Sequence, residues 1–189
     1  MPFLDHFGLL APFYDRVIQT KEPQRMIAYA RLPVQGPLLD AGGGTGRIAH
    51  ALKGYATPLV VADLSVEMLV QAQKKDSLRT VCSHSEKLPF ADESFERVIM
   101  VDAMHHVIDH QETADELWRV LKPGGQIVVE EPDIKLWSVK MIALAEKLAL
   151  MRSHFLSAER IRDLFQDKNS KVEIFREAFN AWVVIEKKI

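Results

Sequence analysis

The chain has 189 residues, of which 48% are hydrophobic, and its formal net charge at pH 7 is −2. That apolar content is enough for one sizeable core, so we expect a single domain over residues 1–189. The small net charge, with acidic and basic residues interspersed, argues against nucleic acid or an anionic membrane as a partner. The only cysteine, Cys82, excludes an internal disulfide, and no apolar run has the roughly 20 residues that span a bilayer. We therefore expect a soluble, cytoplasmic protein.

Secondary-structure patterns alternate along most of the chain. Residues 1–35 contain helical patches broken by prolines, and we expect them to form an N-terminal helical cover or lid. Apolar runs predict strands near residues 37–40, 57–63, 79–83, 96–101 and 126–131, and amphipathic runs predict helices near residues 46–54, 65–75 and 110–121. Asp109 begins the last of these helices with a capping-box pattern, which favours a cap over a catalytic acid. Alternation at this spacing predicts βαβ units and a parallel sheet.

The stretch Asp40-Ala41-Gly42-Gly43-Gly44-Thr45-Gly46 follows the first expected strand and precedes a helix. Glycines at positions 42, 44 and 46 allow a positive φ and let the backbone touch a ligand at the helix N-terminus. Their spacing, G-x-G-x-G, differs from the G-x-G-x-x-G of dinucleotide-binding loops. A carboxylate at Asp40 would repel a pyrophosphate, but it would accept hydrogen bonds from an ammonium group.

A second acid, Asp63, ends the second expected strand, 17 residues after Gly46. In nucleotide-binding α/β folds, an acid about 20 residues beyond the glycine loop binds the ribose hydroxyls. The alternative is that Asp63 caps the following helix, for which Ser65 is at least as good a cap. The glycine loop with its two acids points to S-adenosylmethionine as the cofactor.

The C-terminal part departs from the alternation. Residues 134–151 have apolar positions at helical spacing, and Ser157 begins a second helix that ends near Gln166, so we expect 134–167 to form a helical cover between strands five and six. Two later runs, 172–175 and 182–185, are joined by a link too short for a crossover helix, which predicts an antiparallel hairpin.

Four stretches occur in the order and form of a known family: Leu38–Arg47, Val61–Leu69, Glu86–Val98 and Leu117–Gln126. They resemble the class I S-adenosylmethionine-dependent methyltransferases, in particular the small branch that includes the ubiquinone and menaquinone biosynthesis methyltransferases. The resemblance implies an α/β fold, a three-layer Rossmann-like sandwich around a seven-stranded, mostly parallel sheet in the order 3-2-1-4-5-7-6, with strand 7 antiparallel. It also implies SN2 transfer of a methyl group to a small acceptor, with S-adenosylhomocysteine as the product.

The resemblance also implies a set of cofactor-binding residues. They are Tyr14, Asp40, Ala41, Gly42, Gly44, Gly46, Asp63, Leu64, Met68, His84, Ser85 and Asp102. His84 stands where the family has an Asp that binds the adenine amino group; neutral imidazole can accept that bond and imidazolium cannot. Alternatively, His84 points to solvent and only the Ser85 backbone contacts adenine. Tyr14 is either a lid over the methionine end or a core tyrosine, and Met68 either packs on adenine or belongs to the core.

A pair of histidines, His105 and His106, follows strand four at the edge where open α/β folds bind ligands. Either one is a candidate general base, although a base is needed only if the acceptor must first lose a proton. The alternative is that one histidine packs in the loop and the other caps the next helix. We expect no metal, because neither a carboxylate nor a cysteine completes a ligand set with His84, His106 and His110.

Competing functions remain open at this level. The fold can retain its cofactor pocket and lose methyl transfer, which would leave a protein that only binds S-adenosylmethionine or S-adenosylhomocysteine. A nicotinamide-dependent oxidoreductase is disfavoured because the third glycine of G-x-G-x-x-G is missing. If the apolar stripe of residues 134–151 lines the site, the acceptor is partly apolar. We expect a monomer or a homodimer.

Overall fold

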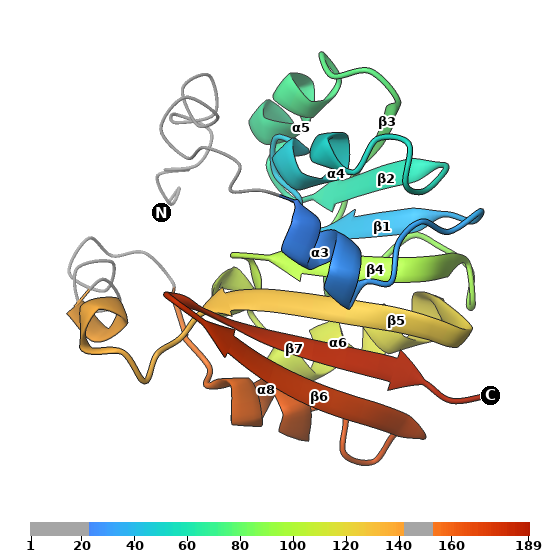
Figure 1. Ribbon diagram of the computed structural model, residues 1–189. Coiled ribbons are helices and arrows are strands. Elements are labelled where there is room, and N and C mark those ends of the chain that lie inside the picture. The colour runs from blue at the N-terminus through green and yellow to red at the C-terminus, as the bar shows by residue number, and fades with distance from the viewer. Residues whose placement is uncertain (1–22, 142–152) are drawn as a thin grey trace.

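A computed structural model describes residues 23–141 and 153–189 of the chain (Figure 1). A seven-stranded sheet crosses this part in the order β3-β2-β1-β4-β5-β7-β6, which confirms the predicted topology. The strands are β1 (Leu38–Ala41), β2 (Leu59–Asp63), β3 (Leu78–Cys82), β4 (Phe95–Val101), β5 (Leu121–Pro132), β6 (Ser170–Glu177) and β7 (Asn180–Lys187). Only β7 is antiparallel to its neighbours, β5 and β6, as predicted.

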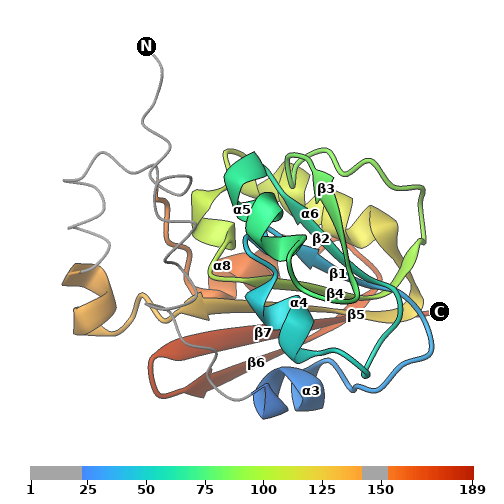
Figure 2. The same cartoon turned by 90° about the horizontal axis from the view of Figure 1, so that it is seen from above.

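Helices cover both faces of the sheet, which gives three layers (Figure 2). They are α3 (Gln24–Tyr29), α4 (Arg47–Ala51), α5 (Val66–Ala72), α6 (His110–Val120) and α8 (Ala158–Asp163), with a 3-10 turn, η1 (Met104–His106). One core lies between the sheet and helices α6 and α8, and includes Leu117 and Ile161. A second lies between the sheet and α3, and includes Met26 and Trp182. A small third cluster joins α4, β2 and α5 through Ala49, Val61 and Leu69.

Three of the helices begin at the caps that the sequence indicates. The side chain of Ser65 accepts a hydrogen bond from the Met68 N–H, Asp109 accepts one from Glu112, and Ser157 accepts one from Arg160. Because an uncapped first turn leaves N–H groups without partners, these side chains fix where α5, α6 and α8 start. Asp109 is therefore a cap, as predicted, and neither His105 nor His106 caps α6.

The residues after β5 do not face the core as their apolar spacing predicts. Trp137 is 75% exposed and Met141 is 46% exposed, whereas Val139 is fully buried. The rest of the predicted stripe, within residues 142–152, lies outside the described residues, as do Tyr14 and the proposed lid up to residue 22. Within the described residues, no helix combines the length and the apolar character that crossing a membrane requires.

Gly46, the N-cap of α4, has a φ of +69°, and an added Cβ there would lie 2.6 Å from the Leu78 Cδ1. A substitution at Gly46 therefore causes both backbone strain and overpacking. Gly54 has a φ of +89° and nothing within 4 Å of an added Cβ, so Gly54→Ala isolates the backbone strain. We expect Gly54→Ala to destabilise by about 1–2 kcal/mol, and Gly46→Ala by about 1–3 kcal/mol more through overpacking. Urea unfolding of both variants measures the difference, and equal losses would contradict the packing role of Gly46.

Candidate active site

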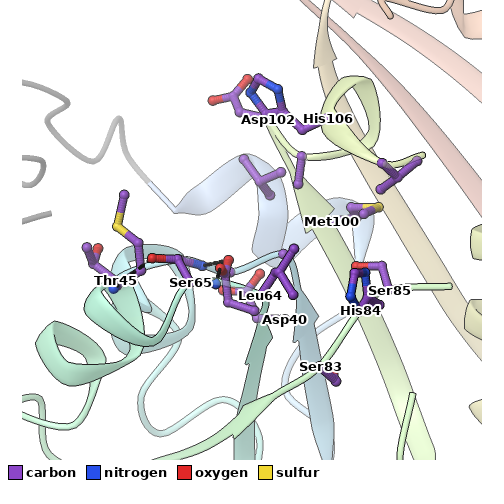
Figure 3. Close-up of a pocket in the computed structure, with 18 of the residues that line it drawn as sticks. Asp40, Thr45, Leu64, Ser65, Ser83, His84, Ser85, Met100, Asp102 and His106 are labelled. Carbon is purple, nitrogen blue, oxygen red and sulfur yellow. Dashed lines mark hydrogen bonds between the residues drawn. The ribbon is translucent and has the colours of Figure 1, made fainter. Parts of the chain in front are cut away.

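A cleft of about 450 Å³ opens at the carboxyl ends of β1, β2, β3 and β4 (Figure 3). The predicted site residues that line it are Asp40, Gly42, Gly44, Asp63, Leu64, Met68, His84, Ser85, Asp102 and His106. Three others do not line it: Ala41 is fully buried in β1, Gly46 caps α4, and His105 is buried behind the loop. The sheet thus brings together residues that are up to 66 positions apart in the sequence (Asp40 and His106).

The Asp63 carboxylate joins two loops of the cleft. Its Oδ2 accepts a hydrogen bond from the Gly44 N–H at 2.7 Å, and its Oδ1 accepts one from the Ser65 N–H at 2.8 Å. Since Ser65 supplies the helix cap, Asp63 is not the cap that the alternative interpretation made it. Each carboxylate oxygen can accept more than one hydrogen bond, so these two bonds do not by themselves prevent Asp63 from binding a ligand.

The glycine loop approaches the loop after β4 closely. Gly42 has a φ of +67°, and an added Cβ would lie 2.6 Å from the Ala103 Cβ. At Gly44, φ is +54° and the atoms nearest to an added Cβ are the Asp63 Oδ2 (3.9 Å) and the Met68 Sδ (4.0 Å), so a Cβ would meet no clash there. Gly42 therefore permits close loop packing, whereas Gly44 supplies a positive φ at the wall of the cleft.

Asp40 lies beneath the glycine loop and is only 2% exposed. Its Oδ2 accepts a hydrogen bond from the Ala49 N–H at 3.3 Å, and an added Cβ on Gly43 would lie 2.6 Å from its Cγ. Burial raises the pKa of Asp40 from 3.8 to about 7, although the Ala49 bond and the charge of Arg47 oppose the shift. The cleft therefore contains an acid that titrates near neutrality.

His84 and Ser85 follow β3 and lie close together at one side of the cleft (Figure 3). The His84 ring is half exposed, and its Nδ1 lies 3.8 Å from the Glu86 Oε2. Glu86 also lines the cleft, and its Oε1 accepts hydrogen bonds from the backbone N–H groups of Ile108 (2.7 Å) and Asp109 (3.3 Å). Glu86 belongs to one of the family-like stretches, but its role could not be predicted from the sequence, because the two amides that it binds are 22 and 23 residues away.

Helix α6 fixes the loop that follows β3. The Arg119 guanidinium donates hydrogen bonds to the carbonyl oxygens of Leu88 (3.0 Å) and Phe90 (2.8 Å). The neighbouring Glu116 carboxylate accepts one from the Leu88 N–H at 2.7 Å and pairs with Arg119. This pairing lowers the pKa of Glu116 and raises that of Arg119. The arrangement holds the backbone beside His84 and Ser85 against a rigid helix.

The two histidines after β4 occupy different environments. His105 is 5% exposed, and its Nδ1 lies 2.5 Å from the Glu131 Oε2. His106 lines the cleft, as Asp102 of the same loop does, and the Ser153 Oγ is 3.5 Å from the His106 Nδ1. This placement favours a structural role for His105 and leaves His106 as the candidate general base.

In residues 23–141 and 153–189, no three His, Cys, Asp or Glu side chains are grouped so that they could hold a metal ion.

Asp40 makes the stability of the protein depend on pH. The pKa of Asp40 is about 7 in the folded chain and ordinarily 3.8. Between these two pH values the carboxyl group is therefore protonated in the folded chain and ionised in the unfolded chain. The contribution of the protonated Asp40 to the free energy of unfolding is fully present below about pH 4 and is lost as pH rises through 7. We expect the melting temperature of wild type to fall relative to that of Asp40→Asn between pH 4 and 8. Parallel melting curves for the two proteins would contradict this expectation.

Comparisons with known proteins agree with this geometry. Residues 39–129 match the family model described as a methyltransferase domain. A demethylmenaquinone methyltransferase from Clavibacter sepedonicus is 35% identical over 138 residues, which are 67% of this chain and 56% of that protein. The chain thus spans about half the length of such curated relatives.

Solved structures show the same fold over nearly the whole chain. One chain in the complex of the Haloferax volcanii Trm112 methyltransferase activator with a methyltransferase has a TM-score of 0.83 and 20% identity, covering 98% of this chain and 99% of its own. An S-adenosylmethionine-dependent methyltransferase from Thermotoga maritima has a TM-score of 0.73 and 21% identity, covering 96% and 100%. Residues 39–129 are therefore similar to a methyltransferase domain, and the chain has the fold of these solved methyltransferase structures.

Proposed function

We propose that the chain is an S-adenosylmethionine-dependent methyltransferase that acts on a small, partly apolar molecule. The observation that carries this proposal is the arrangement at the carboxyl ends of β1 and β2. There, the Asp63 carboxylate, the buried Asp40 and the bare backbone at Gly44 share one cleft. An acid at the end of the second strand suits ribose hydroxyls, and an open glycine backbone suits a ligand that approaches the helix N-terminus.

Each part of the cleft suits one part of this cofactor. Asp63 would accept hydrogen bonds from the ribose hydroxyls, and Asp40 with the glycine loop would hold the charged methionine end. His84, Ser85 and Met68 would surround the adenine. The cofactor supplies a methyl group already activated by a positive sulfur, so the protein mainly has to align the reactants and exclude water.

His106 is the candidate general base for an acceptor that must lose a proton. It lies on the cleft wall, on the loop that follows β4 and that also contributes Asp102 to the cleft. A neutral imidazole nitrogen can take a proton from a hydroxyl or an activated carbon acid within hydrogen-bond reach. Asp102 lines the same cleft, and its negative charge would favour the imidazolium that results.

The acceptor class is inferred from the rim of the cleft and from the relatives. Val107 and Ile108 line the cleft, and Ile108 is 71% exposed, so an apolar surface borders the side of His106. Relatives at 30–37% identity carry the name demethylmenaquinone methyltransferase. We infer a small aromatic or otherwise partly apolar acceptor. A cytoplasmic location, the lack of a nucleic-acid partner, and a monomeric or homodimeric state stay predictions from the sequence.

The alternative is a protein that binds the cofactor without transferring its methyl group. Incubation with S-adenosylmethionine and a panel of phenols and hydroquinones separates the two functions, with S-adenosylhomocysteine release and a methylated product followed by mass spectrometry. Transfer that is lost in His106→Ala, with S-adenosylhomocysteine affinity retained, supports the enzyme and the base. Binding without product on any member of the panel favours the alternative.

Asp63→Ala tests the ribose contact. A hydrogen bond to a charged group contributes about 1.5–3 kcal/mol, so S-adenosylhomocysteine affinity should fall roughly tenfold to more than a hundredfold. The apo protein should also lose stability, because the Gly44 and Ser65 N–H groups lose their acceptor.

Ser157→Ala is the control for this stability loss. It removes the cap of α8, away from the cleft, and should destabilise by about 1 kcal/mol without changing affinity. Titration calorimetry and thermal melting of both variants give the two quantities. An Asp63→Ala protein that binds as tightly as Ser157→Ala would contradict the ribose assignment.

A further inference from the structure

A buried carboxylate outside the cofactor contacts has no role in the proposed chemistry. Glu131, near the end of β5, is 3% exposed. Its Oε1 accepts hydrogen bonds from the backbone N–H groups of Ala103 (2.9 Å) and Met104 (2.7 Å), and its Oε2 lies 2.5 Å from the His105 Nδ1. All three partners belong to the short loop that follows β4.

Net stability alone does not account for a carboxylate at this position. Removing a charge from water is costly, and a buried ionic group is often no more stabilising than a well-packed apolar side chain. Residues on the same strand nearby, such as Val129, are apolar and fully buried, so the core accepts apolar side chains here. An apolar residue, however, could neither accept hydrogen bonds from two backbone N–H groups nor orient an imidazole.

The loop that Glu131 holds forms one wall of the cleft. Asp102, Ala103 and His106 line the cleft, and the Ala103 side chain packs against the backbone of Gly42. The His105 ring stacks on Phe155 at 4.2 Å between centroids and contacts the His106 ring at 4.0 Å. The position of Ala103 therefore affects the glycine loop, and the position of His105 affects His106.

A second segment is held at the same place. The His154 N–H donates a hydrogen bond to the His105 carbonyl oxygen at 2.7 Å. The Ser153 hydroxyl lies 3.5 Å from the His106 ring. The buried pair of His105 and Glu131 therefore connects the end of β5, the loop after β4 and residues 153–155.

We propose that Glu131 is a positioning residue for the methyl-transfer site, acting through Ala103, Met104 and the His105 ring to set the placement of His106 and of the glycine loop. The inference rests on the proposed function, since it assigns His106 and the glycine loop to the acceptor and cofactor sides of one cleft. On this account His105 touches neither ligand, and its conservative replacement should affect the site only through its neighbours.

Three variants test the proposal. Glu131→Ala removes the acceptor, whereas in Glu131→Gln the side-chain oxygen can still accept both backbone N–H groups and the amide can donate to a neutral His105. Val184→Ala is the control, because Val184 is a buried core residue of β7 on the α3 side of the sheet and does not line the cleft. The measurements are S-adenosylhomocysteine affinity by calorimetry, melting temperature, and two NMR signals: amide exchange at Ala103 and Met104, and the ring resonances of His106.

We expect Glu131→Ala to weaken S-adenosylhomocysteine binding roughly tenfold, and Glu131→Gln to remain within about threefold of wild type. Val184→Ala should lower the melting temperature without changing affinity. In Glu131→Ala the two amides should exchange faster and the His106 resonances should shift. Affinity in Glu131→Ala equal to that in Val184→Ala, or Glu131→Gln as weak as Glu131→Ala, would overturn the proposal.

Two further results remain decisive. If wild type binds no S-adenosylhomocysteine, the proposed function fails, and unchanged His106 resonances in Glu131→Ala would separately overturn the positioning role. If Glu131→Ala does not fold, His105→Phe replaces it, because phenylalanine keeps the stacked ring but removes the Nδ1 contact. That variant should shift the His106 resonances and weaken binding, and no change in either would overturn the proposal.

Discussion

The Asp63 carboxylate holds the cofactor cleft together before any ligand arrives. It accepts hydrogen bonds from the Gly44 and Ser65 N–H groups and so connects the loop after β1 to the start of α5. Glu86, after β3, accepts hydrogen bonds from the N–H groups of residues 108 and 109. Glu131, on β5, accepts hydrogen bonds from those of residues 103 and 104. In each case an acid contributed by one strand or its loop holds a loop that follows another strand. Because loops at the carboxyl edge of a parallel sheet lack ladder partners, these acids supply the acceptors that their amides need.

This arrangement also sets the charge of the site. Asp40, Asp63 and Glu86 all line the cleft, and Asp40 is buried deeply enough to have a pKa of about 7. A positive charge placed nearby would favour the ionised form of Asp40 and so be bound more tightly as pH rises. An anionic pyrophosphate would meet repulsion at the same place. The acids therefore organise the loops, and their negative charge would favour a cationic ligand.

The order of the strands in the sheet and many of the cleft residues could be predicted from the sequence. Alternating apolar and amphipathic runs locate the parallel strands, and Ser65, Asp109 and Ser157 mark helix starts because a cap depends only on its own first turn. The glycine loop and Asp63 have a fixed spacing that reflects one local βαβ unit. These features are local, and the structure confirms their placement.

Features that depend on distant contacts could not be predicted in this way. Glu131 occurs in a predicted strand, and nothing near it in the sequence indicates that its partners are 26 to 28 residues away. His105 and His106 are adjacent, and only the fold of the η1 turn buries one and leaves the other on the cleft. Trp137 belongs to an apolar stripe that predicts burial, yet its side chain is 75% exposed.

Ligand selection by thermal shift tests the central claim most directly. A ligand that binds only the folded chain stabilises it by RT ln(1 + [L]/Kd), which is about 2.7 kcal/mol at a hundredfold excess over Kd. S-adenosylmethionine and S-adenosylhomocysteine should raise the melting temperature of wild type at pH 8, and NAD and NADH should not. A rise with the nicotinamides and none with the two sulfur compounds would contradict the account.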